Sequence, residues 1–225
     1  YLIRYLRTIR RIFLPKFYHD VDINASYILF PLHKTPEATT FVKTPFYLNQ
    51  ILVIEAISKS LKYNQYLYIK EHYASLTERK SIFYKKLSRL PNVKFVDPFK
   101  YTVKELIKSS EGVITITGST AFEAQLLGKN SAVFGESQYN LVSSIDVIKS
   151  FKDIPSVIEK WPKKINKKEI YAYINICNKY GYDIDMSHIN VPPKFIKDKN
   201  LNNKNALNLY KLFINDYEQN FKDSA

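Results

Sequence analysis

The sequence predicts an α/β fold with a parallel sheet covered by helices, and three observations support it. Five apolar segments alternate with segments of helical periodicity between residues 26 and 135. Each apolar segment is short, which is typical of strands buried on both faces. The chain has 225 residues, 45% of them hydrophobic, and is long enough to bury such a core. We therefore expect a Rossmann-like sheet domain.

The segment before the sheet is predicted to be a basic amphipathic helix. In LIRYLRTIRRIF the apolar residues recur at helical spacing and the arginines lie largely off that stripe, until Pro15 stops the helix. The chain begins at Tyr1 rather than at a methionine, so it can be a piece of a longer protein. We assign residues 1–22 to this helix and a linker, and a membrane-surface role for the helix stays open.

The elements of the predicted sheet domain follow in order along the chain. Strands are expected at 26–31, 66–70, 93–96, 112–117 and 131–135, and helices at 48–61, 77–90, 102–110 and 120–127. Gly128 suits the position that ends the last of these helices. The segment HKTPEATTFVKTP, after the first strand, holds two prolines and is predicted to be a non-helical loop.

The remainder of the chain is rich in Lys and Asn and is predicted to be helical. Helices are expected at about 153–160, 167–180 and 201–220, with two prolines at 192–193 between the last two. We assign residues 23–150 to the sheet domain and residues 151–225 to a helical extension packed on it. Ligands of parallel sheets bind beyond the carboxyl ends of the strands, so the loops after the strands should carry the chemistry.

The charge of the chain limits its partners. The net charge is +13, and most of the excess lies in residues 1–100. This balance suits an anionic partner, whether a nucleotide, an acidic glycan, a phospholipid surface or nucleic acid, although a solvated lysine-rich surface explains it equally well. The aromatic residues mostly occupy apolar periodic positions instead of alternating with Lys and Arg, which argues against a nucleic-acid-binding protein.

Cysteine and histidine usage narrows the class of protein further. Cys177 is the single cysteine, which excludes an internal disulfide framework and fits a reducing, cytoplasmic compartment. The four histidines are far apart in sequence, and none has a partner at metal-ligand spacing. We therefore predict neither a metal site nor a cofactor.

The stretch VITITGSTAFEAQLLGK, from residue 113 to residue 129, has two interpretations. Gly118 permits a tight turn, and Ser119 and Thr120 place hydroxyls beside the free N–H groups of the next helix, which together form an anion site. Alternatively, Thr120 and Glu123 form a capping box that only holds the helix end. This segment alone does not decide between the two.

Two other loops at the same edge of the sheet carry candidate residues. KEH follows the second strand, where Lys70 supplies positive charge and His72 a proton donor near a leaving phosphate. PLHKTPEATT follows the first strand, where His33, Lys34 and Glu37 are either substrate contacts or ordinary loop polarity.

Five blocks occur in an order that resembles bacterial capsular polysaccharide and surface carbohydrate biosynthesis proteins. The blocks are YILFPLHKTPEATT, YLNQILVIEAISKSL, LYIKEH, PNVKFVDP and GVITITGSTAFEAQLLGKNSAVFG, with Tyr139 close behind, and they cover about residues 26–140. The group is similar to the Kdo transferases of capsule assembly and, more distantly, to bacterial sialyltransferases and polyglycerol-phosphate polymerases. The resemblance implies a GT-B glycosyltransferase, in which two Rossmann-like domains face each other across a cleft. This chain resembles the C-terminal, donor-binding domain, so an N-terminal GT-B domain is an expected partner.

The resemblance assigns roles to individual residues. His72 falls on the family's histidine-proline motif, which contacts the donor phosphate and stabilises the departing nucleotide. Tyr73 stands where that motif has proline. Ser119 and Thr120 fall on the serine/threonine motif that binds the same phosphate, with the preceding glycine letting the phosphate approach. Glu123 falls on the glutamate that holds the nucleotide ribose in many GT-B enzymes.

The implied reaction is transfer of a sugar, Kdo or a similar acidic sugar, from a CMP-activated donor in capsular or surface polysaccharide biosynthesis. The leaving group of such a donor is CMP, which carries its charge on one phosphate and can be stabilised without a metal. Lys70, His33 and Glu37 complete the predicted donor site. The expected acceptor is an anionic or lipid-linked glycan, and the expected location is the cytoplasm, alternatively the inner face of the cytoplasmic membrane. Two other functions stay open: a polyol-phosphate (glycerophosphate) transferase of wall or capsule polymers, and a non-catalytic nucleotide-sugar or glycan-binding domain.

Overall fold

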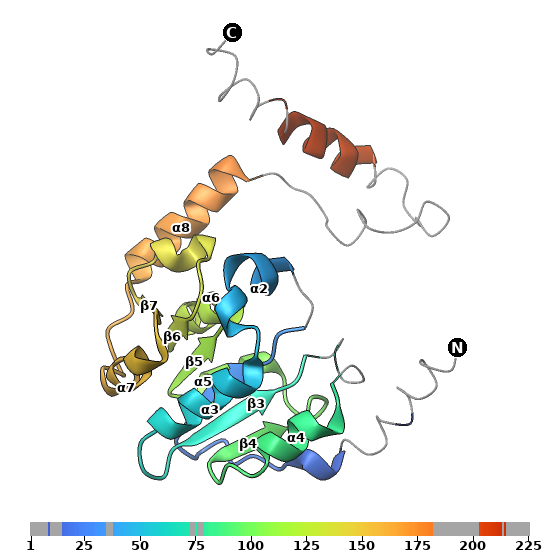
Figure 1. The fold of residues 1–225 in the computed structure, drawn as a ribbon. Helices are drawn as coiled ribbons and strands as arrows, with labels where there is room; N and C mark the ends of the chain where they lie inside the picture. Colours follow the sequence, from blue (N-terminus) through green and yellow to red (C-terminus); the bar gives the residue numbers. More distant parts are fainter. Residues whose placement is uncertain are drawn as a thin grey trace. The chain divides into compact units, whose positions relative to one another are not determined.

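A computed structural model describes residues 9, 15–34, 38–72, 75, 79–181, 203–212 and 214 of the chain. By their contacts the residues divide into two compact units, Tyr1–Ile170 and Tyr171–Ala225. The first unit contains a parallel seven-stranded sheet with helices on both faces (Figure 1). This arrangement confirms the predicted α/β, Rossmann-like fold class.

The order of the strands places a switch point at the middle of the sheet. The strands are β1 (Tyr18–His19), β2 (Tyr27–Pro31), β3 (Tyr66–Lys70), β4 (Val93–Val96), β5 (Gly112–Thr115), β6 (Asn130–Val133) and β7 (Ile145–Val147), in the spatial order β1-β4-β3-β2-β5-β6-β7. From β2 the chain moves outward through β3 to β4, and it then returns to form β5 on the other side of β2. The loops after β2 and β5 therefore diverge, and in doubly wound sheets ligands bind in the crevice that such loops leave.

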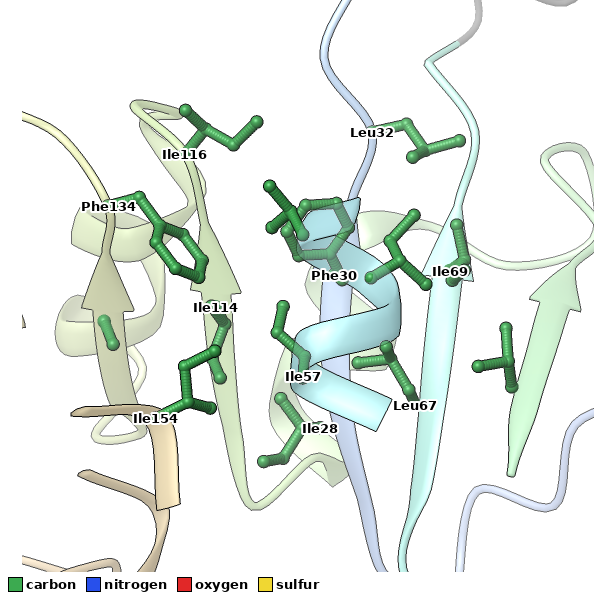
Figure 2. Packing of buried hydrophobic residues seen from close by; sticks show 14 of the residues in the cluster. Ile28, Phe30, Leu32, Ile57, Leu67, Ile69, Ile114, Ile116, Phe134 and Ile154 are labelled. Atoms are coloured by element: carbon green, nitrogen blue, oxygen red, sulfur yellow. The ribbon is translucent and has the colours of Figure 1, made fainter. Parts of the chain in front are cut away.

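Both faces of the sheet are buried, because alternate residues of each strand pack under different helices. On β2, Ile28 and Phe30 belong to one apolar cluster, whereas Tyr27 and Leu29 belong to the other. The first cluster lies under α3 (Gln50–Ser60), α4 (Ser81–Leu87) and α7 (Ile154–Glu159), and the second under α5 (Val103–Ser109) and α6 (Thr120–Leu126). Figure 2 shows the first cluster, where side chains of β2, β3 and β5 point toward α3 and α7.

The structure corrects one predicted loop and adds two strands. The segment predicted to be a non-helical loop contains the helix α2 (Ala38–Lys43), followed by a 3-10 turn, η2 (Pro45–Tyr47). The prolines flank this helix instead of interrupting it, and Pro45 begins η2, where its missing N–H costs nothing. The short strands β1 and β7 were not predicted, since they have only two and three residues.

The later helices begin and end close to their predicted positions. α7 and α8 (Lys167–Tyr180) match two predicted helices, and residues 203–212 of the third are helical. Other 3-10 turns of the described residues include η1 (Pro15–Phe17), η4 (Gln138–Leu141) and η5 (Phe151–Asp153). Most of the predicted N-terminal helix and the two prolines at 192–193 lie outside the described residues.

None of the helices in the described residues combines the length and the apolar character needed to cross a bilayer.

Candidate functional site

A pocket of about 490 Å³ lies at the switch point of the sheet. We call it the switch-point pocket. Its walls come from the loops after β2, β5 and β6, with contributions from α2 and from the loop after β3. The lining residues are Pro31, Leu32, His33, Lys34, Lys43, His72, Thr115, Thr117, Gly118, Ser119, Thr120, Ser137, Gln138 and Tyr139. The chain thus brings His33, His72, Gly118, Ser119 and Thr120 of the predicted site together around one cavity.

The charge of the switch-point pocket is of one sign. Lys34 and Lys43 are exposed at its wall, His72 is exposed beside them, and none of its described lining residues is an Asp or a Glu. Cationic and hydroxyl groups that converge without a carboxylate favour an anionic ligand. Glu37, which was predicted to contact the donor, and Tyr73 both lie outside the described residues.

Position 118 favours glycine because neighbouring side chains leave no room for a Cβ atom, and not because of its backbone angles. The positive φ of Gly128 marks the end of α6 as predicted, whereas Gly118 does not have a left-handed backbone. A Cβ atom at Gly118 would lie 2.7 Å from Thr115 Oγ1 and 3.3 Å from His33 Cε1. The turn between β5 and α6 therefore sits directly on these two side chains.

The His33 ring contacts this turn through its Nε2 atom. Its Nε2 lies 2.9 Å from Thr115 Oγ1, 3.3 Å from the Ile116 amide nitrogen and 3.4 Å from that of Thr117. Backbone amides can only donate, so Nε2 accepts and the ring proton is on Nδ1. The Gly118 amide in turn donates to Thr115 Oγ1 at 3.3 Å. With 8% of its surface exposed, His33 acts in this structure as a support for the glycine turn.

Tyr139 holds the same turn from the side of β6. Its hydroxyl oxygen lies 2.7 Å from the Thr117 carbonyl and 2.6 Å from the Gly118 carbonyl, so one O–H proton is shared between two acceptors. Burial raises the pKa of Tyr139, and the hydroxyl stays protonated and able to donate. Its ring stacks on Phe122 of α6 at 6.1 Å between centroids.

The capping box predicted for Thr120 and Glu123 is wrong. α6 begins at Thr120 itself, and the residue before it, Ser119, has helical angles and makes no capping hydrogen bond. Ser119 Oγ donates to Glu123 Oε1 at 2.9 Å, and Glu123 is exposed outside the residues that line the switch-point pocket. The hydroxyls of Thr117 and Thr120 are buried and have no partner among the described residues.

Lys70 has a structural role that its position in the sequence did not indicate. Its ammonium nitrogen lies 2.7 Å from the Pro98 carbonyl, 2.6 Å from the Tyr101 carbonyl and 3.4 Å from that of Asp97. Burial lowers the pKa of Lys70. Because its three N–H donors all point at the β4–α5 loop, Lys70 holds that loop in this structure, and its role in binding the donor stays a prediction.

A second cavity of about 410 Å³, the side pocket, adjoins the first. The two share Pro31, Leu32, His72 and Thr120, so His72 lines both. Pro98, Phe99, Tyr101 and Val103 give the side pocket an apolar and aromatic wall, and Lys70, Glu71 and Thr102 also line it. Among the described residues there is no group of three His, Cys, Asp or Glu side chains that could hold a metal ion.

Several residues of the site could not be found from the sequence. Lys43 lies on α2, in a segment predicted to be a loop. Thr117 was predicted to be in a strand, but β5 ends two residues earlier and leaves Thr117 in the turn. Glu71, buried beside His72, lies in the KEH stretch but was given no role of its own, and its ion-pair partner Arg79 carried no motif. Tyr139 had a signal, since it accompanies the blocks of the family resemblance.

Comparison with known proteins finds solved structures of similar fold. No protein-family model and no curated protein matches the chain. The chain is similar to the structure of the β-Kdo 2,7-transferase of Thermosulfurimonas dismutans KpsC. The TM-score is 0.50 and the identity 15%, over 76% of this chain and 53% of that chain. The β-Kdo 2,4-transferase of KpsC has a TM-score of 0.47 and 12% identity, over 76% and 54%. The UDP-GlcNAc 2-epimerase of Methanocaldococcus jannaschii has a TM-score of 0.49 and 16% identity, over 79% and 52%.

The chain spans about half the length of each of these structures. At 15% identity, the likeness to the Kdo 2,7-transferase structure establishes the fold alone. The described sheet domain therefore shares its Rossmann-like α/β fold with that structure.

Proposed function

We propose that this chain is the donor-binding half of a glycosyltransferase and that its switch-point pocket binds the phosphate of a nucleotide-activated sugar. One observation carries the proposal. At the point where a doubly wound sheet binds ligands, two lysines, an imidazole and several hydroxyls line one cavity with no carboxylate among its described residues. The unpartnered hydroxyls of Thr117 and Thr120 at this wall are suited to become donors to a phosphate oxygen.

The proposed donor is a CMP-activated acidic sugar such as Kdo. A nucleoside monophosphate leaves with its charge on a single phosphate, which the groups of the switch-point pocket can match without a metal. The carboxylate of an acidic sugar also suits a cavity wall without an opposing acid. The side pocket supplies what the nucleoside needs, because Phe99 and Tyr101 offer aromatic surface beside His72.

In the proposed reaction, the bond between the anomeric carbon and the phosphate oxygen breaks, and a bond to the acceptor hydroxyl oxygen forms. The electron pair of the broken bond stays on the phosphate, where His72, Lys34 and Lys43 stabilise the charge. The acceptor's proton passes to a base, which we assign to the partner N-terminal domain. The acceptor, an anionic or lipid-linked glycan, would approach from that side.

Isothermal titration of the full chain with CMP, inorganic phosphate and UDP tests the proposal. We expect saturable binding of CMP, and weaker binding of phosphate because it lacks the contacts of the nucleoside. Lys43→Ala should weaken CMP binding about fivefold, since one exposed cation is worth roughly 1 kcal/mol. Lys168→Ala is the matched control, because Lys168 is an exposed lysine that lies outside both pockets. Phe99→Ala should weaken the binding of CMP and leave that of phosphate unchanged.

The alternatives give different results when the titration is extended to CDP-glycerol and to a CMP-sugar. Tighter binding of CDP-glycerol than of CMP would favour a polyol-phosphate transferase. Binding of a CMP-sugar that is never cleaved, even with the N-terminal domain added, would favour a non-catalytic binding domain. No saturable binding of any cytidine nucleotide, or an equal loss in Lys43→Ala and Lys168→Ala, would overturn the proposal.

A further inference from the structure

Glu71, the residue before His72, is a buried carboxylate with a complete set of partners. Its side chain has no exposed surface. One oxygen lies 3.0 Å from Arg79 Nε and 3.2 Å from the His72 amide, and the other accepts from the Tyr84 hydroxyl at 2.7 Å. Burial and the negative charge of Glu71 raise the pKa of Tyr84, which keeps that hydroxyl protonated. The carboxylate thereby holds the His72 backbone at the end of β3.

Arg79 connects this carboxylate to a second loop. Its side chain is 8% exposed, and its Nη2 donates to the His33 carbonyl while its Nε donates to Glu71. The guanidinium also lies over the Phe83 ring, 4.9 Å from the centroid. Gln50 holds the same stretch of backbone, because its side chain bonds both the N–H and the carbonyl of His33. One planar cation therefore joins the loops after β2 and β3.

These contacts begin where the sheet stops holding the two loops together. The pairing of β2 with β3 ends at Pro31 and Lys70, with one more hydrogen bond from the Leu32 amide to the Lys70 carbonyl. Beyond that point His33 and His72 are on separate loops that both line the switch-point pocket. The Arg79 guanidinium bonds to both loops, through the Glu71 carboxylate and the His33 carbonyl.

We propose that Arg79, acting through Glu71, is a positioning residue that sets the separation of the His33 and His72 loops and so the affinity of the switch-point pocket for phosphate. This inference rests on the proposed function for its ligand. Lysine cannot replace arginine in this role, since an ammonium on a flexible stem cannot reproduce two hydrogen bonds from one fixed plane. Charge alone would not suffice.

The test compares Arg79→Lys with Arg89→Lys in the full chain. Arg89 is exposed, lines neither pocket and undergoes the same chemical change. CMP affinity, measured by titration calorimetry, should fall about tenfold in Arg79→Lys and stay within twofold in Arg89→Lys. The ¹⁵N signals of the histidine rings are the second readout, and those of His33 and His72 should shift in Arg79→Lys only. The indole N–H of Trp161, the single tryptophan, donates to Asp146 on β7 and should not move.

Each outcome bears on the proposal. Equal affinities of the two variants, or a Trp161 signal that moves as far as those of His33 and His72, would overturn it. If Arg79→Lys does not fold, Tyr84→Phe removes one donor to Glu71, and a loss of affinity of about threefold is then required. If the wild-type chain binds no CMP, the proposed function fails, and the histidine signals still decide whether Arg79 positions the loops.

Discussion

Two helix starts in this protein have the same spacing of residues and different structures. α5 starts with TVKE at residues 102–105, and α6 starts with TAFE at residues 120–123. In α5 the Glu105 amide donates to Thr102 Oγ1 at 3.2 Å, and the Thr102 amide donates to the Glu105 carboxylate at 2.7 Å, which completes a capping box. In α6 neither bond is present, and the Thr120 hydroxyl has no partner in the described part of the chain.

The backbone before each helix explains the difference. Thr102 has an extended backbone, with ψ of 155°, which is the geometry that turns a cap side chain toward the free amides. Ser119 has φ of −57° and ψ of −20°, so the chain enters α6 already coiled. The turn there is held by contacts to His33, Thr115 and Tyr139. Residues that line the switch-point pocket therefore hold this backbone, and the Thr120 hydroxyl takes no part in capping α6.

The largest expected effect comes from adding a methyl group at the glycine before α6. Gly118→Ala would place a Cβ 2.7 Å from Thr115 Oγ1, and neither that buried hydroxyl nor His33 behind it can move freely. We expect CMP affinity, measured by calorimetry, to fall tenfold or more, about 1.4 kcal/mol. Gly128→Ala, at the other end of the same helix, is the control: its left-handed backbone should cost about 1 kcal/mol of stability and leave affinity unchanged. Equal affinities of the two variants would refute this account of the turn.

The two threonines should respond in opposite ways to alanine. Thr102→Ala removes a cap and should lower the free energy of unfolding in urea by about 1 kcal/mol. Thr120→Ala removes an unpaired hydroxyl, so stability should stay the same or rise slightly, while CMP affinity falls about threefold. A loss of stability in Thr120→Ala as large as that in Thr102→Ala would mean that Thr120 caps α6 after all.

The contrast between the two starts also shows what the sequence can predict. Alternating strands and helices are encoded locally by apolar periodicity, and their order was predictable. Which of TVKE and TAFE forms a capping box was not predictable, since it depends on the backbone angles at the start of each helix. Before α6 these angles belong to a turn that His33 and Tyr139 hold from distant loops. Arg79 was unpredictable for the same reason: it bonds to a carbonyl 46 positions away. Helix α2 was not predictable in this way, because its two prolines flank the helix and from the sequence alone argue against one.

The smallest expected effect is a pH dependence at the α5 capping box. The pKa of Glu105 is lowered from its ordinary value of 4.5, first by the Thr102 amide and then by the Thr102 hydroxyl. Because the folded pKa lies below the unfolded one, ionised Glu105 contributes stability that is complete above the unfolded pKa and is lost as the pH falls through the folded pKa. The melting temperature of wild type should therefore exceed that of Glu105→Gln at pH 7, and the gap should close in acid. Thr102→Ala keeps the amide donor and should retain most of this pH dependence. A difference in melting temperature between wild type and Glu105→Gln that is equal at pH 3 and pH 7 would exclude the Glu105 carboxylate as its cause.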